Sequence, residues 1–433
     1  MPGIARAAEA IASDARRRRL ARGLLASVFT LAALTLLAEL GLRAADYRGR
    51  TFAATVNRTI ARWVALTRAG VFEELDDPVR RYRMRPGAEA EVDGWTFRVT
   101  RHATRGADFP LAKPPGEKRI LALGDSFCFG MWCDEDETVV GHLARLANAR
   151  EAELGSGTTW RAVNLGVPGY HTGQQLAAFE QDGLALDPDL VVLYFNTNDI
   201  EQEGFFYDAE LGVLRRDFLP LPTRLRARLW SSHLYGWIVG RHRRTVEAGP
   251  VPPHLDPSVP YAFVRADNQA ATRAAIERLR DLCRAGSIPL FFVNQPHLTW
   301  QGDMLNPAWE MLPLVEWAAS MRDELGIPGV DLLGLFRGYS DGVDRLAEGA
   351  PPDLLLDPFV ADERIEAAVR WARETAAARG LDWDDLDVPA RKELFHGYAG
   401  EMSKAPDFHL NGEGYGHIAR VVHGGLRAQG LLP

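Results

Sequence analysis

Between residues 118 and 430, short apolar runs alternate with segments in which apolar residues recur every three or four positions. The runs have the length of strands buried on both faces, and the other segments have the spacing of amphipathic helices. Strands are predicted within residues 119–125, 161–169, 188–199 and 288–296, and a fifth strand or a turn within 327–336. Helices are predicted within residues 137–151, 172–186, 268–286, 311–326 and 411–430. This alternation predicts a three-layer α/β/α sandwich with a parallel sheet of flavodoxin-like type.

Other parts of the chain do not follow this alternation. Residues 43–117 are interpreted as a linker and edge segment with a short hairpin within 76–100, ending in a Pro/Gly turn that opens the main domain, residues 118–433. Two stretches inside that domain, about residues 200–265 and 337–405, are interpreted as insertions over one end of the sheet.

The amino-terminal segment has the pattern of a membrane anchor. A cluster of arginines, Arg16 to Arg19 and Arg22, precedes a 20-residue apolar run from Gly23 to Leu42, which is long enough for a bilayer core of about 30 Å. The prediction is a cytoplasmic basic tail (1–19) and a transmembrane signal anchor (20–42), with the main domain on the extracytoplasmic, periplasmic side. A cleaved signal peptide and a buried helix of the main domain are the alternatives.

Charge and cysteine content narrow the classes of function. The formal net charge of −8 argues against general nucleic-acid binding, which usually needs a basic face. The three cysteines form no CxxC pattern and do not suggest a zinc site. Cys128 and Cys133 are close enough in sequence to form a disulfide in an oxidising compartment; the alternative is that they are ordinary unpaired side chains.

Polar residues directly follow the predicted strands, at the sheet edge where open α/β folds bind ligands. They are Gly124-Asp125-Ser126, Gly166 to Tyr170 and Asn196 to Asp199, and Asp407 and His409 precede the last helix. A serine hydroxyl becomes a good nucleophile when an imidazole takes its proton and a carboxylate orients that imidazole. Backbone N–H groups and an asparagine amide can then stabilise the oxyanion.

The motifs LGDSF, NLGVPGY, NTND and DFHLNGEGY, in this order and spacing, resemble those of the SGNH hydrolases, or GDSL-type esterases and lipases, and the apolar run suggests their membrane-anchored branch. The resemblance covers about residues 118–200 and 405–425. It implies that Ser126 is the nucleophile, His409 the base and Asp407 its partner. The N–H groups of Ser126 and Gly169 and the Asn198 amide would form the oxyanion hole.

The sequence departs from the family pattern at two places. Asn196 stands where the third motif usually has glycine, and Asp407 lies two residues before His409, where three is common. The GxSxG elbow of the α/β-hydrolases is absent from the sequence. Asp125 is interpreted as structural and Asp199 as part of a polar network.

The expected reaction is cleavage of a carboxylic ester through an acyl-enzyme on Ser126, with no metal or other cofactor required. The expected substrate is an ester-bearing small molecule, lipid or envelope saccharide, and His297, after the fourth strand, is a candidate substrate contact. One alternative is an O-acyltransferase that acts on cell-envelope polysaccharide with the same triad, and another is an inactive binding module. The aromatic segments 205–207 and 234–238 fit core or lid packing, a platform for sugars or acyl chains, or a surface on the membrane.

Overall fold

A computed structural model gives the structure of the chain in two units. One unit contains residues 1–57 and 219–244, and the other contains residues 58–218 and 245–433. The described residues are 2–48, 50, 58–202, 205–208, 213–216, 221, 225, 228–229, 231–247, 251–256, 258–259, 261–301, 304–333, 362–391, 394 and 409–433.

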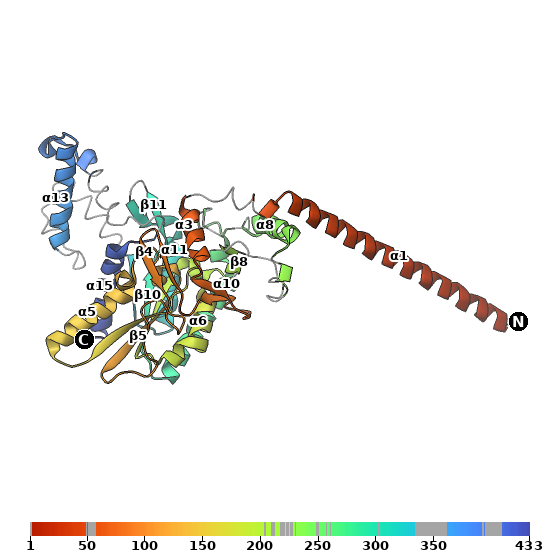
Figure 1. Ribbon diagram of the computed structural model, residues 1–433, viewed down its shortest axis with the longest axis horizontal. Coiled ribbons are helices and arrows are strands. Elements are labelled where there is room, and N and C mark those ends of the chain that lie inside the picture. Colours follow the sequence, from red (N-terminus) through yellow and green to blue (C-terminus); the bar gives the residue numbers. More distant parts are fainter. Residues whose placement is uncertain are drawn as a thin grey trace. The chain divides into compact units, whose positions relative to one another are not determined.

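A five-stranded parallel sheet forms the centre of the larger unit (Figure 1). Its strands are β5 (Glu117–Gly124), β6 (Thr159–Asn164), β7 (Leu190–Asn196), β10 (Leu290–Gln295) and β13 (Gly329–Asp331). The spatial order is β13-β10-β7-β5-β6, and every neighbouring pair is parallel. This is the flavodoxin-like order, in which the chain reverses its direction of travel beside β5. The predicted fold class is therefore confirmed.

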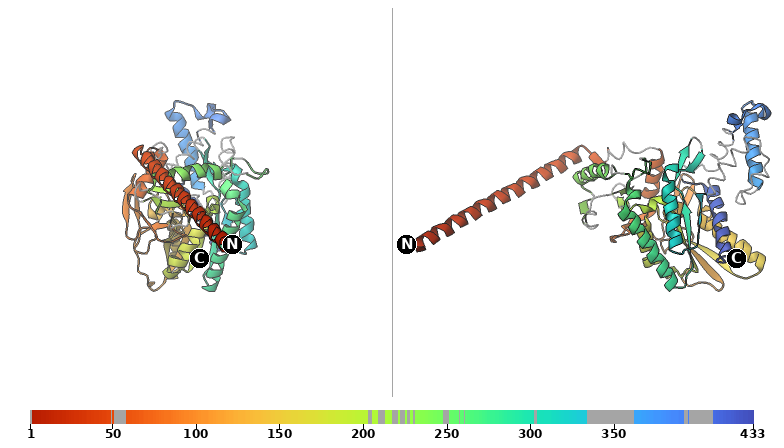
Figure 2. Two further views of the ribbon diagram at one scale, coloured as in Figure 1. Left: turned by 90° about the vertical axis from the view of Figure 1, so that its right-hand side faces the viewer. Right: turned by 180° about the vertical axis from the view of Figure 1, so that it is seen from behind.

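Helices cover both faces of the sheet (Figures 1 and 2). Successive strand residues point to opposite faces: in β7, Leu190 and Val192 belong to one buried apolar cluster and Val191 and Leu193 to another. The first cluster includes α5 (Val139–Leu154) and α15 (Gly412–Ala428). The second includes α10 (Ala266–Ala285) and α11 (Leu312–Glu324), and α6 (Thr172–Ala178) packs against α10. The result is three layers.

Residues 58–98 form a helix and two hairpins: α3 (Arg58–Arg68), β1 (Phe72–Glu74) with β2 (Tyr82–Met84), and β3 (Glu89–Val92) with β4 (Trp95–Arg98). The hairpin predicted within 76–100 is β3–β4. It turns at Asp93 and Gly94, whose φ angles of 51° and 90° suit a tight hairpin turn. Phe72, Tyr82 and Phe97 are fully buried in the cluster that contains α10 and α11, so this segment supplies part of the hydrophobic core.

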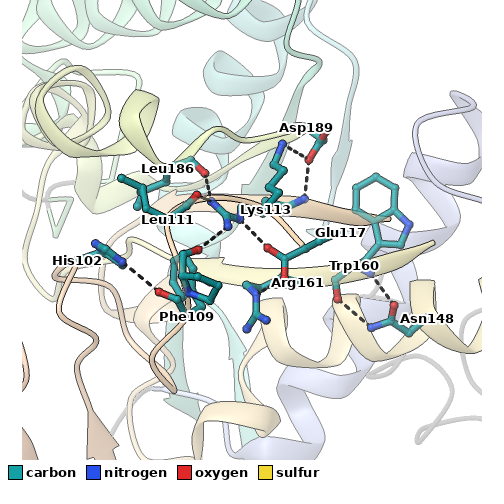
Figure 3. A network of polar contacts seen from close by, with 12 residues as sticks. His102, Phe109, Leu111, Lys113, Glu117, Asn148, Trp160, Arg161, Leu186 and Asp189 are labelled. Atoms are coloured by element: carbon teal, nitrogen blue, oxygen red, sulfur yellow. Dashed lines mark hydrogen bonds and ion pairs between the residues drawn. The ribbon is translucent and has the colours of Figure 1, made fainter. Parts of the chain in front are cut away.

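A network of polar contacts lies at the end of the sheet where the strands begin (Figure 3). Arg119 on β5 is fully buried and forms an ion pair with Glu117 at 2.9 Å. Its guanidinium also donates to the carbonyl oxygens of Leu111 and Leu186, at 2.9 and 2.8 Å. Because a buried guanidinium needs such partners, these contacts tie the loop before β5 to the sheet.

The remaining elements of the larger unit are mostly short, apart from the 17-residue helix α13 (Asp362–Ala378). The predicted helix 172–186 is α6 followed by a wider turn (Phe179–Gly183) and a tighter one (Leu184–Leu186), and the fifth strand is only Gly329–Asp331. The others are α4 (Ser126–Phe129), η1 (Glu135–Glu137), η4 (Thr197–Ile200), β8 (Phe205–Asp208), β9 (Val213–Arg216), α9 (Tyr261–Val264), β11 (Leu298–Gln301), β12 (Met304–Pro307), η5 (Trp309–Met311) and η7 (Trp383–Asp385).

The smaller unit contains α1 (Pro2–Ala44) and α8 (His233–Glu247), whose last residues continue into the larger unit. Within α1, residues 17–44 form a helix that is long and apolar enough to cross a membrane, with a mean hydropathy of 1.9. None of its apolar window is buried within the protein, so the alternative of a buried core helix is wrong. A signal sequence has the same length and composition.

Candidate active site

Ser126 lies on a sharp turn at the carboxyl end of β5, an interior strand of the sheet. Asp125 caps the single-turn helix α4, since its Oδ1 accepts the Phe127 N–H at 2.9 Å. The preceding Gly124 is required by space: a Cβ there would lie 2.6 Å from the Cβ of Cys128 and 2.7 Å from the carbonyl oxygen of Tyr194. The strand therefore passes directly into the helix, and Ser126 is its first residue.

His409 contacts Ser126 directly. Its Nε2 lies 2.7 Å from the serine Oγ, and the two residues are 0% and 5% exposed. The imidazole precedes α15, and its ring packs against Phe127 and Trp63, with centroids 4.7 and 5.9 Å apart. A ring held between aromatic side chains at hydrogen-bond distance can receive the serine proton.

Asn198 reaches the same turn from the neighbouring strand. It belongs to η4, directly after β7, and its Nδ2 donates to Asp125 Oδ2 at 3.0 Å. Asn196 caps this short helix, because its side-chain oxygen accepts the Asn198 N–H at 3.3 Å. Asparagine is a favoured cap, which gives a physical reason for its presence where the family usually has glycine.

Gly169 lies in the loop that follows β6 on the other side of β5. The Val167 N–H in this loop donates to the carbonyl oxygen of Gly124 at 3.1 Å. The Tyr82 hydroxyl donates to the Pro168 carbonyl at 2.7 Å. Gly169 has φ +79°, and a Cβ there would lie 2.6 Å from the Phe205 ring. Only glycine fits this loop without strain.

Two fully buried carboxyl groups support the site. Burial raises the pKa of Asp125, although hydrogen bonds from Asn198 and Phe127 oppose this effect. Burial and the nearby charge of Asp125 raise the pKa of Asp199 well above its usual range. Simultaneous ionisation of the two carboxyls is disfavoured by their repulsion.

Cys128 and Cys133 are buried free thiols, so the alternative that they form a disulfide is wrong. The Cys133 thiol donates to the carbonyl oxygen of Gly130 at 3.3 Å. Burial raises the pKa of Cys133 to about 12 and also raises that of Cys128. Both therefore stay protonated and serve as small side chains packed beneath the serine turn.

Of the two remaining candidate residues, His297 and Asp407, the structure describes only His297. His297 follows β10 at the edge that carries Asn198, because Gln295 pairs with Asn196 across the two strands. Asp407 lies outside the described residues.

The sequence did not predict two contacts of the site: the packing of Trp63 against His409 and the hydrogen bond from Asn198 to Asp125. The apolar spacing within residues 58–68 was the available signal for the helix that carries Trp63.

The fold and this site define a three-layer α/β/α protein that carries a serine beside an imidazole at the carboxyl ends of its parallel strands. The family model described as the GDSL-like lipase/acylhydrolase family matches residues 122–354, more than half of the chain. The chain belongs to this family and is a hydrolase. The match begins within β5 and includes Ser126, Gly169 and Asn198.

Several solved structures show limited similarity. A lipase/acylhydrolase from Enterococcus faecalis is 14% identical over 72% of this chain and 96% of its own, with a TM-score of 0.33. A GDSL-like lipase from Bacteroides thetaiotaomicron is 12% identical over 72% and 89%, with a TM-score of 0.28. A variant of an acetyl xylan esterase from Geobacillus stearothermophilus is 16% identical over 51% and 78%, with a TM-score of 0.29. No curated protein matches the chain.

Proposed function

We propose that the protein is a serine esterase that cleaves a carboxylic ester through an acyl-enzyme on Ser126. The observation that carries this proposal is the 2.7 Å contact between His409 Nε2 and Ser126 Oγ. A hydroxyl and an imidazole at this distance at the carboxyl end of an interior parallel strand are the two groups that nucleophilic acyl transfer needs first.

In the first half-reaction, His409 takes the Ser126 proton while Oγ bonds to the ester carbonyl carbon. The carbonyl electron pair moves to oxygen and forms an oxyanion. We assign the oxyanion to the N–H groups of Ser126 and Gly169 and to the Asn198 amide. An asparagine Nδ2 carries two hydrogens, so one can remain on Asp125 while the other donates to the oxyanion.

The intermediate then collapses, the ester C–O bond breaks, and His409 gives its proton to the departing alcohol. In the second half-reaction, water gives a proton to His409 and attacks the acyl carbon, and the acid leaves as Ser126 recovers its proton. Asp407 is assigned the role of orienting His409, which it precedes by two residues. None of these steps needs a metal or other cofactor.

The location we propose is the membrane, with α1 as an uncleaved single-pass anchor and the hydrolase unit on the extracytoplasmic side, as in the membrane-anchored branch of the family. The arginine cluster before the apolar run supports this orientation. Esters on lipids or envelope saccharides would be within reach of such an enzyme. His297 is the proposed substrate contact because it follows β10 at the edge that carries Asn198.

The proposal is tested by p-nitrophenyl acetate hydrolysis with the full chain in detergent. Ser126→Ala should lower the rate by about a thousandfold or more. Ser320→Ala, at an exposed serine on α11, should leave it unchanged. Equal rates in the wild type and Ser126→Ala would contradict the proposal. Release of one nitrophenol per protein molecule, with continued release only when a sugar hydroxyl is supplied, would instead indicate acyl transfer.

A further inference from the structure

Glu39, the only charged residue in the apolar run of α1, binds the first turn of α8. Its Oε2 accepts from the Ser232 hydroxyl at 2.7 Å and from the Leu234 N–H at 2.8 Å. Its Oε1 accepts the His233 N–H at 3.1 Å. A carboxylate on the free N–H groups of a helix start both caps the helix and complements its dipole. The capping residue Glu39 precedes Ser232 by 193 positions in the sequence.

Two arginines extend the contact between the same elements. Arg43 forms an ion pair with Glu39 at 2.9 Å and donates to the Ser231 carbonyl at 3.1 Å. The backbone N–H of Arg48 donates to His233 Nδ1 at 3.4 Å, and its aliphatic stem lies against Gly236. The first turn of α8 is therefore fixed to residues 39–48, where the apolar run of α1 ends.

The helix α8 carries apolar side chains on an exposed face as well as on a buried one. Tyr235 and Val239 are buried, whereas Trp237 and Ile238 are 41% and 40% exposed. Positions 234, 237, 238 and 241 share one face of a helix. Its last member, Arg241, places its guanidinium 6.0 Å from the centre of the Trp237 ring. This face is apolar at one end and cationic at the other.

The position of Glu39 indicates what covers this face. The apolar run is 20 residues long, so at about 1.5 Å per residue it matches a bilayer core of about 30 Å. Glu39 lies within one turn of the end of that run, which brings the start of α8 to the boundary between acyl chains and headgroups. Tryptophan favours this boundary, and arginine binds lipid phosphate there.

We propose that α8 is an interfacial helix whose face formed by Leu234, Trp237 and Ile238 lies in the headgroup region of an anionic phospholipid bilayer. Arg241 contacts the lipid phosphates, and Glu39 fixes the helix at this depth. The inference rests on the membrane anchoring proposed above. Because the chain passes between this unit and the hydrolase unit after residues 57, 218 and 244, the hydrolase is tethered to the membrane at three points of its sequence.

The test uses nitroxide labels on the full chain in nanodiscs of phosphatidylcholine and phosphatidylglycerol. The three native cysteines are buried, so labels are introduced with Ile238→Cys and, as a matched control, Leu184→Cys, whose leucine is 38% exposed in the larger unit. Collision with oxygen reports lipid and collision with a nickel chelate reports water. The label at position 238 should collide severalfold more with oxygen than with the nickel chelate. The label at position 184 should collide more with the nickel chelate.

A third label, Phe29→Cys inside the apolar run of α1, separates the possible failures. Lipid contact at 29 with water contact at 238 would overturn the α8 proposal and leave the anchor intact, whereas water contact at both would overturn the anchor as well. Shielding of the label at 238 from both reagents would indicate a second copy of the chain and contradict lipid contact.

The variant Glu39→Gln tests the role of Glu39. It should remove the lipid contact of the label at 238 and keep that of the label at 29. An unchanged signal at 238 would refute the role of Glu39. Hydrolysis of p-nitrophenyl acetate by the same samples tests the catalytic proposal separately.

Discussion

At the scale of single residues, Asp125 connects the nucleophile turn to the proposed oxyanion donor. One carboxylate oxygen accepts the Phe127 N–H at 2.9 Å, and the other accepts Asn198 Nδ2 at 3.0 Å. An ionised carboxylate can accept on both oxygens, whereas an amide has only one accepting oxygen. Asp125 is therefore a positioning residue in this account, because it sets the direction of the Asn198 amide.

Asp125→Asn tests this positioning role. Either orientation of the new amide places an N–H₂ group against one of the two donors, so the Asn198 amide or the α4 cap is displaced. The expected result is a kcat lowered by about tenfold to a hundredfold with little change in KM, measured on p-nitrophenyl acetate. An unchanged kcat would refute the role, and a change in KM alone would indicate lost substrate binding.

The reactive residues were more predictable than the residues that position them. Ser126, Asn198 and His409 lie in short motifs directly after strands or before the last helix, and the structure places Ser126 and His409 in contact. The contact of Trp63 with His409 depends on how α3 packs against the domain, and no local pattern encodes such packing.

At the scale of elements, His171 caps helix α6, and we expect it to make the stability of the fold depend on pH. Its Nδ1 accepts the Gly173 N–H at 3.1 Å, which requires the neutral ring. Burial, with a smaller contribution from the charge of Arg81, lowers the pKa of His171 to about 3. The unfolded chain binds this proton near pH 6.5. As the pH falls from about 6.5 toward 3, protonation of the unfolded chain removes stability.

The variant His171→Asn keeps a favoured cap and removes the titration. Between about pH 8 and pH 5, the wild type should lose about 2 kcal/mol of unfolding free energy relative to the variant. Urea unfolding of both proteins at the two pH values measures the difference. Equal losses of unfolding free energy in the wild type and the variant would mean that the pKa of His171 in the folded protein is close to its value in the unfolded chain.

The sheet and its long helices were predictable because burial on both faces leaves a strong periodic signal. Helices α11 and α15 lie within their predicted ranges, and α5 and α10 extend beyond theirs by two or three residues. The hairpins β8–β9 and β11–β12 were not predicted. Their strands of four residues each are too short for apolar alternation to separate them from loops.

At the scale of the whole molecule, we propose that α1 anchors the hydrolase unit to the membrane. The proposed membrane anchoring requires α1 in the mature protein, and cleavage after the apolar run would remove the cap that Glu39 provides for α8. The full chain should stay in the membrane pellet after alkaline carbonate extraction, with α1 present in its intact mass. Release into the supernatant with a mass that lacks α1 would identify a cleaved signal instead.

The most direct test of the central claim is covalent labelling of the full chain with a fluorophosphonate, followed by peptide mass analysis. We expect one adduct, on Ser126, because His409 Nε2 lies 2.7 Å from its Oγ. His409→Gln should prevent the adduct while circular dichroism shows the fold retained. An adduct on another serine, or none on the folded wild type, would contradict the assignment of Ser126 as the nucleophile.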